Sequence, residues 1–217
     1  MLKFRQVSPK FLLVFIVFFL SFNSSSAQDY YGSSYSQKAV SLGIVFSPNA
    51  SWLRYGNRSF VDKELSIGYS YGLSADFALS QNYYFSSGFI INNLKSSSKI
   101  HADEPSTTYE FQYVEVPFGL KLKSTQRYYR SYYGQFGFTG GMKVGSDKTI
   151  GKGDKEDLDA KLFRLGLQIG GGIEWQLDHN LVFVTGLSYN NGITRVVGKE
   201  FGNPKNTYIA LNFGILF

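Results

Sequence analysis

Residue types that perform catalysis are scarce in this sequence. The chain has two histidines and no cysteine. His101 has Ser96–Ser98 upstream and Asp103 and Glu104 just downstream, a set that would supply the nucleophile, base and orienting carboxylate of a lipid hydrolase. A polar loop rarely holds such groups in a fixed geometry, so we interpret His101 as a surface histidine. His179 stands in an Asp-His-Asn stretch, which turn formation explains.

The stretches that resemble ion-binding loops lack the required spacing. DKEDLD at 154–159 offers carboxylate oxygens but has neither the central glycine nor the terminal glutamate of a calcium loop. GKGD at 151–154 has no apolar strand before it and no helix after it, both of which a phosphate-binding loop requires. The lack of cysteine argues against a disulfide scaffold or a thiolate metal site. We therefore predict no catalytic residue, no metal site and no cofactor.

The charged residues of greatest interest lie in segments with strict alternation. In KLFRLGLQIGGGIEWQL, residues 161–177, apolar side chains alternate with small or polar ones, among them Arg164 and Glu174. This period of two indicates a strand with two opposite faces. The segment is about three times as long as an average strand, and at ~3.3 Å per residue it outreaches a ~30 Å hydrocarbon layer even when tilted. A strand of this length suits a membrane barrel.

Seven further segments have strand character, and the connections between them alternate in length. Short turns follow the second, fourth and sixth strands, whereas the other connections are long and polar, including 95–108 and 146–160. This asymmetry is typical of an outer-membrane barrel with short periplasmic turns, which places both termini on the periplasmic side. Pro117 lies in mid-strand, where its missing amide proton predicts a β-bulge. The expected strands are 38–52, 64–79, 83–94, 109–123, 128–145, 161–177, 181–191 and 206–217.

The predicted fold is all-β: an eight-stranded antiparallel up-and-down transmembrane β-barrel. Alternation alone does not say which face is inside, because a soluble lipocalin-like barrel turns the same apolar face inward around a ligand. We favour the membrane version because large aromatic residues gather near the strand ends, as in an interfacial girdle. The expected girdle residues are Trp52, Tyr69, Tyr71, Tyr83, Tyr109, Tyr132, Trp175, Tyr189 and Tyr208.

The small and charged face would then fill the barrel. Pairs such as Arg164 with Glu174, or Glu115 with Lys121, would either line a polar pathway or form a structural plug of ion pairs. The plug is the favoured interpretation, because side chains normally fill an eight-stranded interior. The predicted interior charges are Asp76, Glu115, Lys121, Lys143, Arg164 and Glu174.

The N-terminus has the pattern of a secretory signal peptide. Three basic residues precede the apolar run Phe11–Leu20, and small residues lead to a cleavage site after Ala27. The run is short for a retained spanning helix, which needs about 20 residues. The expected division is a signal peptide at 1–27, a flexible periplasmic leader at 28–37 and a barrel domain at 38–217. Cleavage lowers the formal charge from +6 to +3, and the remaining cations are scattered, so nucleic acid binding is not expected.

Most of the mature chain resembles a known family. FQYVEVPFGLKLK, Phe111–Lys123, is similar to the aromatic-Leu-Glu-Ile-Pro, apolar, Lys motif of the PorT-like outer-membrane β-barrel family. LGLQIGGGIEW and LVFVTGLSYNNGIT resemble that family's later strands. The resemblance implies an accessory role in a secretion system that carries cargo proteins across the outer membrane, and it implies no catalytic residues.

These observations together predict an integral outer-membrane protein with a structural or interaction role. Its expected surroundings are the lipid bilayer and other outer-membrane or periplasmic proteins, and we expect a monomer. Two alternatives stay open at this point: a lipid-modifying enzyme that acts at the barrel rim, and a soluble lipid-binding barrel.

Overall fold

The computed structural model describes residues 38–54, 62–99, 107–150, 155–157, 161–194 and 205–217. The predicted signal peptide and leader, His101 and most of the charged loop at 151–160 lie outside these residues. In the described part of the chain, no helix has the length and apolar character to cross a membrane. The described strands are β1 (Val40–Arg54), β2 (Asp62–Glu64), β3 (Ser66–Ser80), β4 (Tyr83–Lys99), β5 (Thr107–Lys123), β6 (Arg130–Ile150), β7 (Lys155–Asp157), β8 (Phe163–Asp178), β9 (Leu181–Gly192) and β10 (Lys205–Leu216).

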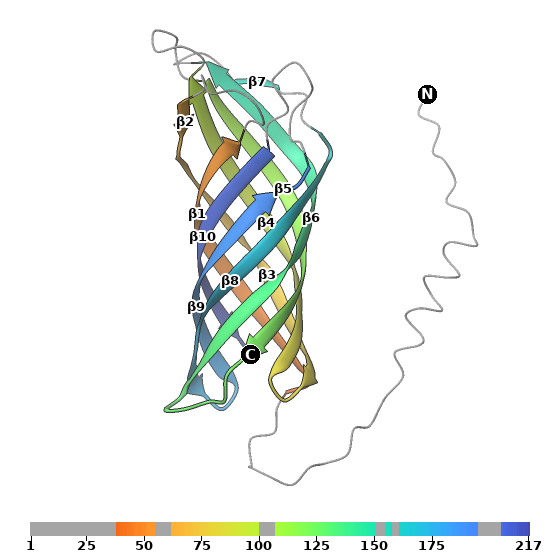
Figure 1. Cartoon of the computed structure of the whole chain (residues 1–217), viewed down its shortest axis with the longest axis vertical. Coiled ribbons are helices and arrows are strands. Elements are labelled where there is room, and N and C mark those ends of the chain that lie inside the picture. The colour runs from red at the N-terminus through yellow and green to blue at the C-terminus, as the bar shows by residue number, and fades with distance from the viewer. Residues whose placement is uncertain (1–37, 55–61, 100–106, 151–154, 158–160, 195–204) are drawn as a thin grey trace, which may run out of the picture. The chain divides into compact units, whose positions relative to one another are not determined.

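Eight long strands close into an antiparallel barrel. The order around the wall is β4, β3, β1, β10, β9, β8, β6, β5, and β5 pairs again with β4 (Figure 1). The first and last strands meet from Gly43 opposite Leu216 to Arg54 opposite Lys205. Short β2 pairs with the end of β4, and β7 with the end of β6. Closure gives every long strand two neighbours, so backbone groups are satisfied within the wall, as hydrocarbon surroundings require. The predicted eight-stranded up-and-down barrel is confirmed.

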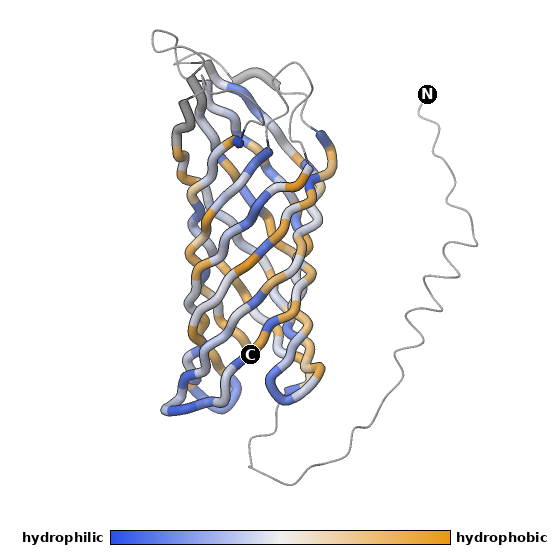
Figure 2. The backbone as a smooth tube through the Cα atoms, viewed as in Figure 1, coloured by the Kyte–Doolittle hydropathy of each residue, from blue (hydrophilic) through white to orange (hydrophobic). Residues whose placement is uncertain are grey.

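The apolar face of each strand points outward. Figure 2 shows hydrophobic residues spread over the barrel wall. A soluble monomer rarely exposes a contiguous apolar patch of more than a few hundred Å², so this surface belongs in lipid. The alternative of a soluble barrel, which requires the apolar face to point inward, is therefore wrong. This outward surface is named here the apolar belt. Its exposed members include Ile44, Phe46, Ile67, Leu73, Phe89, Phe138, Leu167, Ile169, Leu187, Leu211, Phe213 and Ile215.

Several strands continue into segments that the sequence indicated to be loops. β4 runs to Lys99, β5 begins at Thr107 and β6 runs to Ile150, so the expected loops at 95–108 and 146–160 were drawn too long. Side-chain pairs support the extension, because Ser97 and Thr108 hydroxyls lie 3.1 Å apart across β4 and β5. Polar residues on both faces conceal such a strand from hydropathy, although the backbone ladder continues.

Pro117 causes no bulge. It lies opposite Thr139 of β6 in an uninterrupted register, and the β4–β5 register is the same on both sides of it. The proline instead interrupts the pairing of β5 with β4, because the paired residues of β4 stop at Ile90 and resume at Ser87. The Ser87 hydroxyl donates to the Pro117 carbonyl at 2.9 Å and supports the gap. The register shift of β5 against β6 lies instead at Gln112 and Tyr113.

Two of the expected girdle residues lie inside the barrel. Tyr109 and Tyr208 are buried, because each shares its strand face with interior charges or small residues. The other tyrosines of the predicted set are exposed, and the outward Trp52 ring lies 6.5 Å from that of Tyr189. The girdle prediction was therefore wrong where the alternation on β5 and β10 points inward.

Glycines allow the wall to contract around a narrow interior. A Cβ on Gly137 would overlap the Phe118 carbonyl oxygen, and a Cβ on Gly172 would overlap that of Thr185. Gly137 lies opposite Gly119, and Gly172 opposite Gly186, so close approach is shared by both strands.

Candidate functional site

The interior holds most of the chain's chemistry. Five of the six predicted interior charges are buried there: Asp76, Glu115, Lys121, Arg164 and Glu174. The sixth, Lys143, is half-buried near the long-loop end and donates to the Ser146 hydroxyl at 3.1 Å. The five buried charges divide into two networks, one nearer the long loops and one nearer the short turns.

The network nearer the long loops is centred on Glu115. Arg164 Nη1 donates to Glu115 Oε1 at 2.7 Å, and Asn92 and the Tyr208 hydroxyl both donate to Oε2 at 3.1 Å. Arg164 also donates to Asn190 at 2.6 Å. Charge-assisted hydrogen bonds of this kind are about twice as strong as neutral ones.

A glycine makes the central ion pair possible. Gly141 of β6 lies directly opposite both Glu115 of β5 and Arg164 of β8. A Cβ on Gly141 would lie 3.1 Å from Glu115 Cγ and 3.6 Å from Arg164 Cβ. The absence of a side chain there lets the two charges meet across an intervening strand.

The network nearer the short turns contains two cations and two anions. Lys121 Nζ lies 2.7 Å from Asp76 and 2.6 Å from Glu174. Lys123, which we did not predict as an interior charge, lies 3.0 Å from Glu174 and 3.7 Å from Asp76. Lys123 is two positions from Lys121 on β5 and therefore lies on the same face of the strand. This period of two predicts it as an interior charge. The Ser86 hydroxyl completes the network with a 2.7 Å hydrogen bond to Asp76.

The pairings suggested by the sequence are wrong. Arg164 pairs with Glu115 and not with Glu174, and Lys121 pairs with Asp76 and Glu174 and not with Glu115. Residues ten positions apart on one strand are separated by about 33 Å, and six positions by about 20 Å. Ion pairs therefore form between strands, where side chains point toward the barrel axis at the same height.

An apolar cluster lies beyond the Glu115 network toward the long loops. Its members were missed because their strands also carry polar residues, yet Phe111 and Tyr113 alternate in step with Glu115 on β5. Stacked rings run along this strand, with centroids 6.4 Å apart between Tyr109 and Phe111 and 6.2 Å apart between Phe111 and Tyr113. The cluster, named here the aromatic plug, consists of Leu53, Leu94, Tyr109, Phe111, Tyr113, Tyr208 and Ala210.

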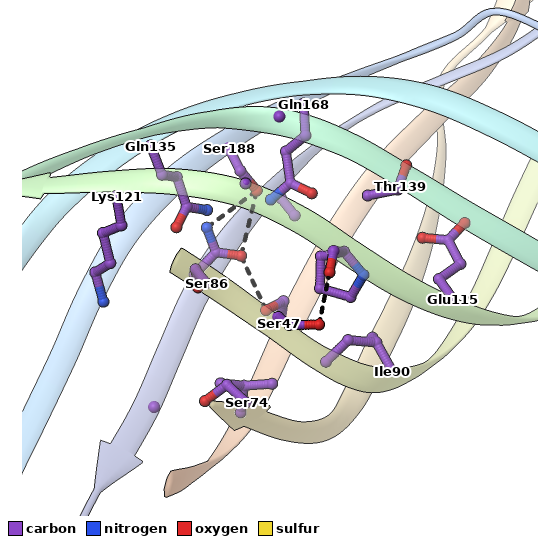
Figure 3. A pocket seen from close by; sticks show the side chains of 18 of the residues that line it. Ser47, Ser74, Ser86, Ile90, Glu115, Lys121, Gln135, Thr139, Gln168 and Ser188 are labelled. Atoms are coloured by element: carbon purple, nitrogen blue, oxygen red, sulfur yellow. Dashed lines mark hydrogen bonds between the residues drawn. The ribbon is translucent and has the colours of Figure 1, made fainter. Parts of the chain in front are cut away.

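A small chamber separates the two charge networks. It has a volume of about 150 Å³ and is lined by hydroxyl and amide side chains together with apolar ones from several strands (Figure 3). One water needs about 10–15 Å³ of such space, so several waters fit, whereas sites for drug-sized ligands measure about 300–1,000 Å³. Hydrogen bonds cross the lining, as where Ser47 donates to Asn212 at 3.0 Å. The chamber suits trapped water and not a large ligand.

The comparisons with known proteins agree with this architecture. Residues 16–194 match the family described as outer membrane protein beta-barrel domain. The chain belongs to this family. No curated protein sequence matches it.

Solved outer-membrane barrels share the fold of this family member. Neisserial surface protein A is 13% identical, with a TM-score of 0.51 over 82% of this chain and 96% of that one. OprG from Pseudomonas aeruginosa is 11% identical, with a TM-score of 0.51 over 85% of this chain and 99% of that one. At these identities the likeness shows the fold alone. With the family match, it makes the chain an integral outer-membrane protein.

The barrel's described residues contain no cluster of three potential metal-ligating side chains. His179 is exposed in the β8–β9 turn, where its backbone amide donates to the Asp178 carboxylate at 2.7 Å and lowers the pKa of that carboxyl. Ser96, one of the serines considered as a nucleophile, is buried and accepts a hydrogen bond from Asn206 at 3.2 Å. His101, Asp103 and Glu104 lie outside the described residues, as does half of the candidate calcium stretch at 154–159.

Proposed function

We propose that this outer-membrane barrel is a non-catalytic, monomeric structural or interaction protein that acts through its two ends. The observation that carries the proposal is an interior filled by side chains except for the small chamber. The aromatic plug and the Glu115 network lie on one side of that chamber along the axis, and the cluster around Lys121 lies on the other. Each network balances its own charges, so neither leaves a free interior charge to attract a permeating ion. A filled interior of this kind supports a scaffold and not a pore.

The ends of the barrel offer the surfaces for partners. At the long-loop end, which faces the cell exterior in outer-membrane barrels, β4, β5 and β6 carry polar residues on both faces. The outward ion pair of Lys95 with Glu110, at 2.8 Å, marks where the apolar belt has ended. Polar sheet above the belt is in water and is accessible to other proteins.

A finer version of the proposal names the partner as a component of protein secretion. It is supported by the resemblance of Phe111–Lys123 to the PorT-like motif. Within that motif, Phe111, Glu115 and Lys121 point into the barrel and pack there. The motif therefore shapes the scaffold, and a secretion partner would contact the ends.

Site-specific photo-crosslinking in the outer membrane tests the proposal. A crosslinker replaces Thr108 at the long-loop end or His179 at the short-turn end, and Ile169 in the apolar belt serves as the matched control. We expect a discrete protein adduct from at least one end and none from Ile169. Adducts with secretion components support the finer version. If every adduct is with a protein that has no part in secretion, the finer version is contradicted.

The absence of adducts from both ends would contradict the interaction role itself. The filled interior is tested separately with the purified barrel in planar lipid bilayers. We expect no stepwise conductance, and regular current steps would overturn the scaffold interpretation.

A further inference from the structure

The turn between β5 and β6 has a strained backbone and carries aromatic and basic side chains. Arg127 and Arg130 exchange both backbone hydrogen bonds, at 2.9 and 3.1 Å, so Tyr128 and Tyr129 are the two central residues of a hairpin turn. Both have left-handed backbones, with φ of 48° and 62°. Such a turn strongly favours asparagine and glycine at these positions. Two tyrosines there are strained, and turn formation does not explain them.

The strained turn is held in place by its neighbours. The Gln176 amide of β8 donates to the Tyr129 carbonyl at 2.7 Å, and the Ser124 amide donates to the Tyr132 carbonyl at 2.8 Å. The Tyr132 amide in turn donates to the Ser124 hydroxyl at 3.0 Å. Backbone strain that surrounding contacts maintain is typical of functional sites.

The turn's side chains face solvent. The Tyr128 side chain is 88% exposed and that of Tyr129 is 71% exposed. Arg127 and Arg130 are also exposed, and neither has a carboxylate partner among the described residues. The Arg130 guanidinium lies 5.9 Å from the centre of the Trp175 ring. Two cations that form no ion pair within the described part of the chain thus flank two exposed rings.

Both arginines and one of the two exposed tyrosines, Tyr128, border one hollow beside the apolar belt. It is lined by Ser124, Thr125, Arg127, Tyr128, Arg130 and Tyr132. Tyr132 belongs to the outward face of β6, opposite Ile173 of β8, so the hollow is continuous with the lipid-facing surface. The hollow lies at the short-turn end, which in an outer-membrane barrel is at the level of the lipid headgroups of the inner leaflet.

We propose that this hollow binds the headgroup of an anionic phospholipid. Guanidinium groups match phosphate oxygens in geometry and charge, and the Ser124 and Thr125 hydroxyls offer further polar contacts. The tyrosine rings occupy the water–membrane boundary, where their apolar bodies and polar tips are both satisfied. The acyl chains would lie along the outward face that begins at Tyr132 and Trp175. The turn thereby fixes the barrel's depth in the inner leaflet.

Native mass spectrometry of the full-length folded chain in detergent tests this proposal, with phosphatidylglycerol as the probe and phosphatidylcholine as the reference lipid. Each basic residue near an anionic surface contributes a factor of about five, so R127Q/R130Q should weaken phosphatidylglycerol binding about 25-fold. The matched control K95Q/K161Q removes two exposed cations from the opposite end. It should change the affinity less than twofold, and phosphatidylcholine binding should not change in either variant.

A second variant separates the rings from the turn. Y128N/Y129G installs the residue pair that this turn prefers, so the fold and both arginines are kept. We expect about a threefold loss of phosphatidylglycerol affinity, because the contribution of aromatic contacts with the headgroup region is smaller than that of the charges.

Four results would overturn the proposal. The first is unchanged phosphatidylglycerol binding by R127Q/R130Q. The second is an equal loss in K95Q/K161Q, which would indicate general charge attraction. The third is displacement of the lipid by inorganic phosphate at equal concentration. The fourth is capture of a periplasmic protein that depends on these residues, combined with lipid binding that does not depend on them.

Discussion

Removing one partner of the buried Arg164–Glu115 pair should cost far more stability than breaking an exposed pair of the same length. The Arg164–Glu115 contact measures 2.7 Å, with the side chains 1% and 3% exposed. The Lys95–Glu110 contact measures 2.8 Å, with 45% and 26% exposure. Arg164→Met leaves the Glu115 carboxylate with only the neutral donors Asn92 and Tyr208. We expect a loss of about 3–5 kcal/mol, against about 0–1 kcal/mol for Lys95→Met.

Urea unfolding of the purified barrel in detergent measures both losses, with the folded fraction read from the electrophoretic mobility of unboiled samples. The double variant Arg164→Met/Glu115→Gln removes both charges. It should lose clearly less than the sum of the two single variants, because the remaining groups are neutral and can still form hydrogen bonds. Equal losses for Arg164→Met and Lys95→Met, or additive losses in the double variant, would show that burial does not decide the energy of this pair.

Three further predictions concern the wall. A closed barrel that stays folded in dodecyl sulfate should change mobility when boiled, and identical mobility of boiled and unboiled samples would contradict closure. Ile169→Arg, in the middle of the apolar belt, should destabilise the barrel in lipid vesicles by about 2–4 kcal/mol, whereas Leu177→Arg near its edge should cost about 0–1 kcal/mol; equal costs would place the belt elsewhere. Gly137→Ala forces a Cβ onto the Phe118 carbonyl and should cost about 1–3 kcal/mol in urea unfolding. Gly134→Ala, with nothing within 4 Å of its Cβ, serves as the control and should be neutral.

Much of the wall was predictable because alternation is local. A side chain's face depends only on its position along its own strand, so the outward belt and the interior location of Asp76 and Arg164 follow from single segments. The same rule predicts that Phe111 and Tyr113 point into the barrel, where they form part of the aromatic plug. They were missed because the face that carries Glu115 was expected to hold only small and charged residues.

The amino-acid sequence alone predicts the eight long strands, their up-and-down order and the face of each that meets lipid, because these depend on local period and on the polarity of the surroundings. Which interior groups meet is set by the closed barrel. Arg164 and Glu115 lie 49 positions apart and pair across a glycine of a third strand. The tilt and stagger of the strands set such heights around a closed barrel, and neither quantity is written in any one segment. The strain of the Tyr128–Tyr129 turn likewise follows from the backbone conformation, because both tyrosines have positive φ angles that their residue types do not predict.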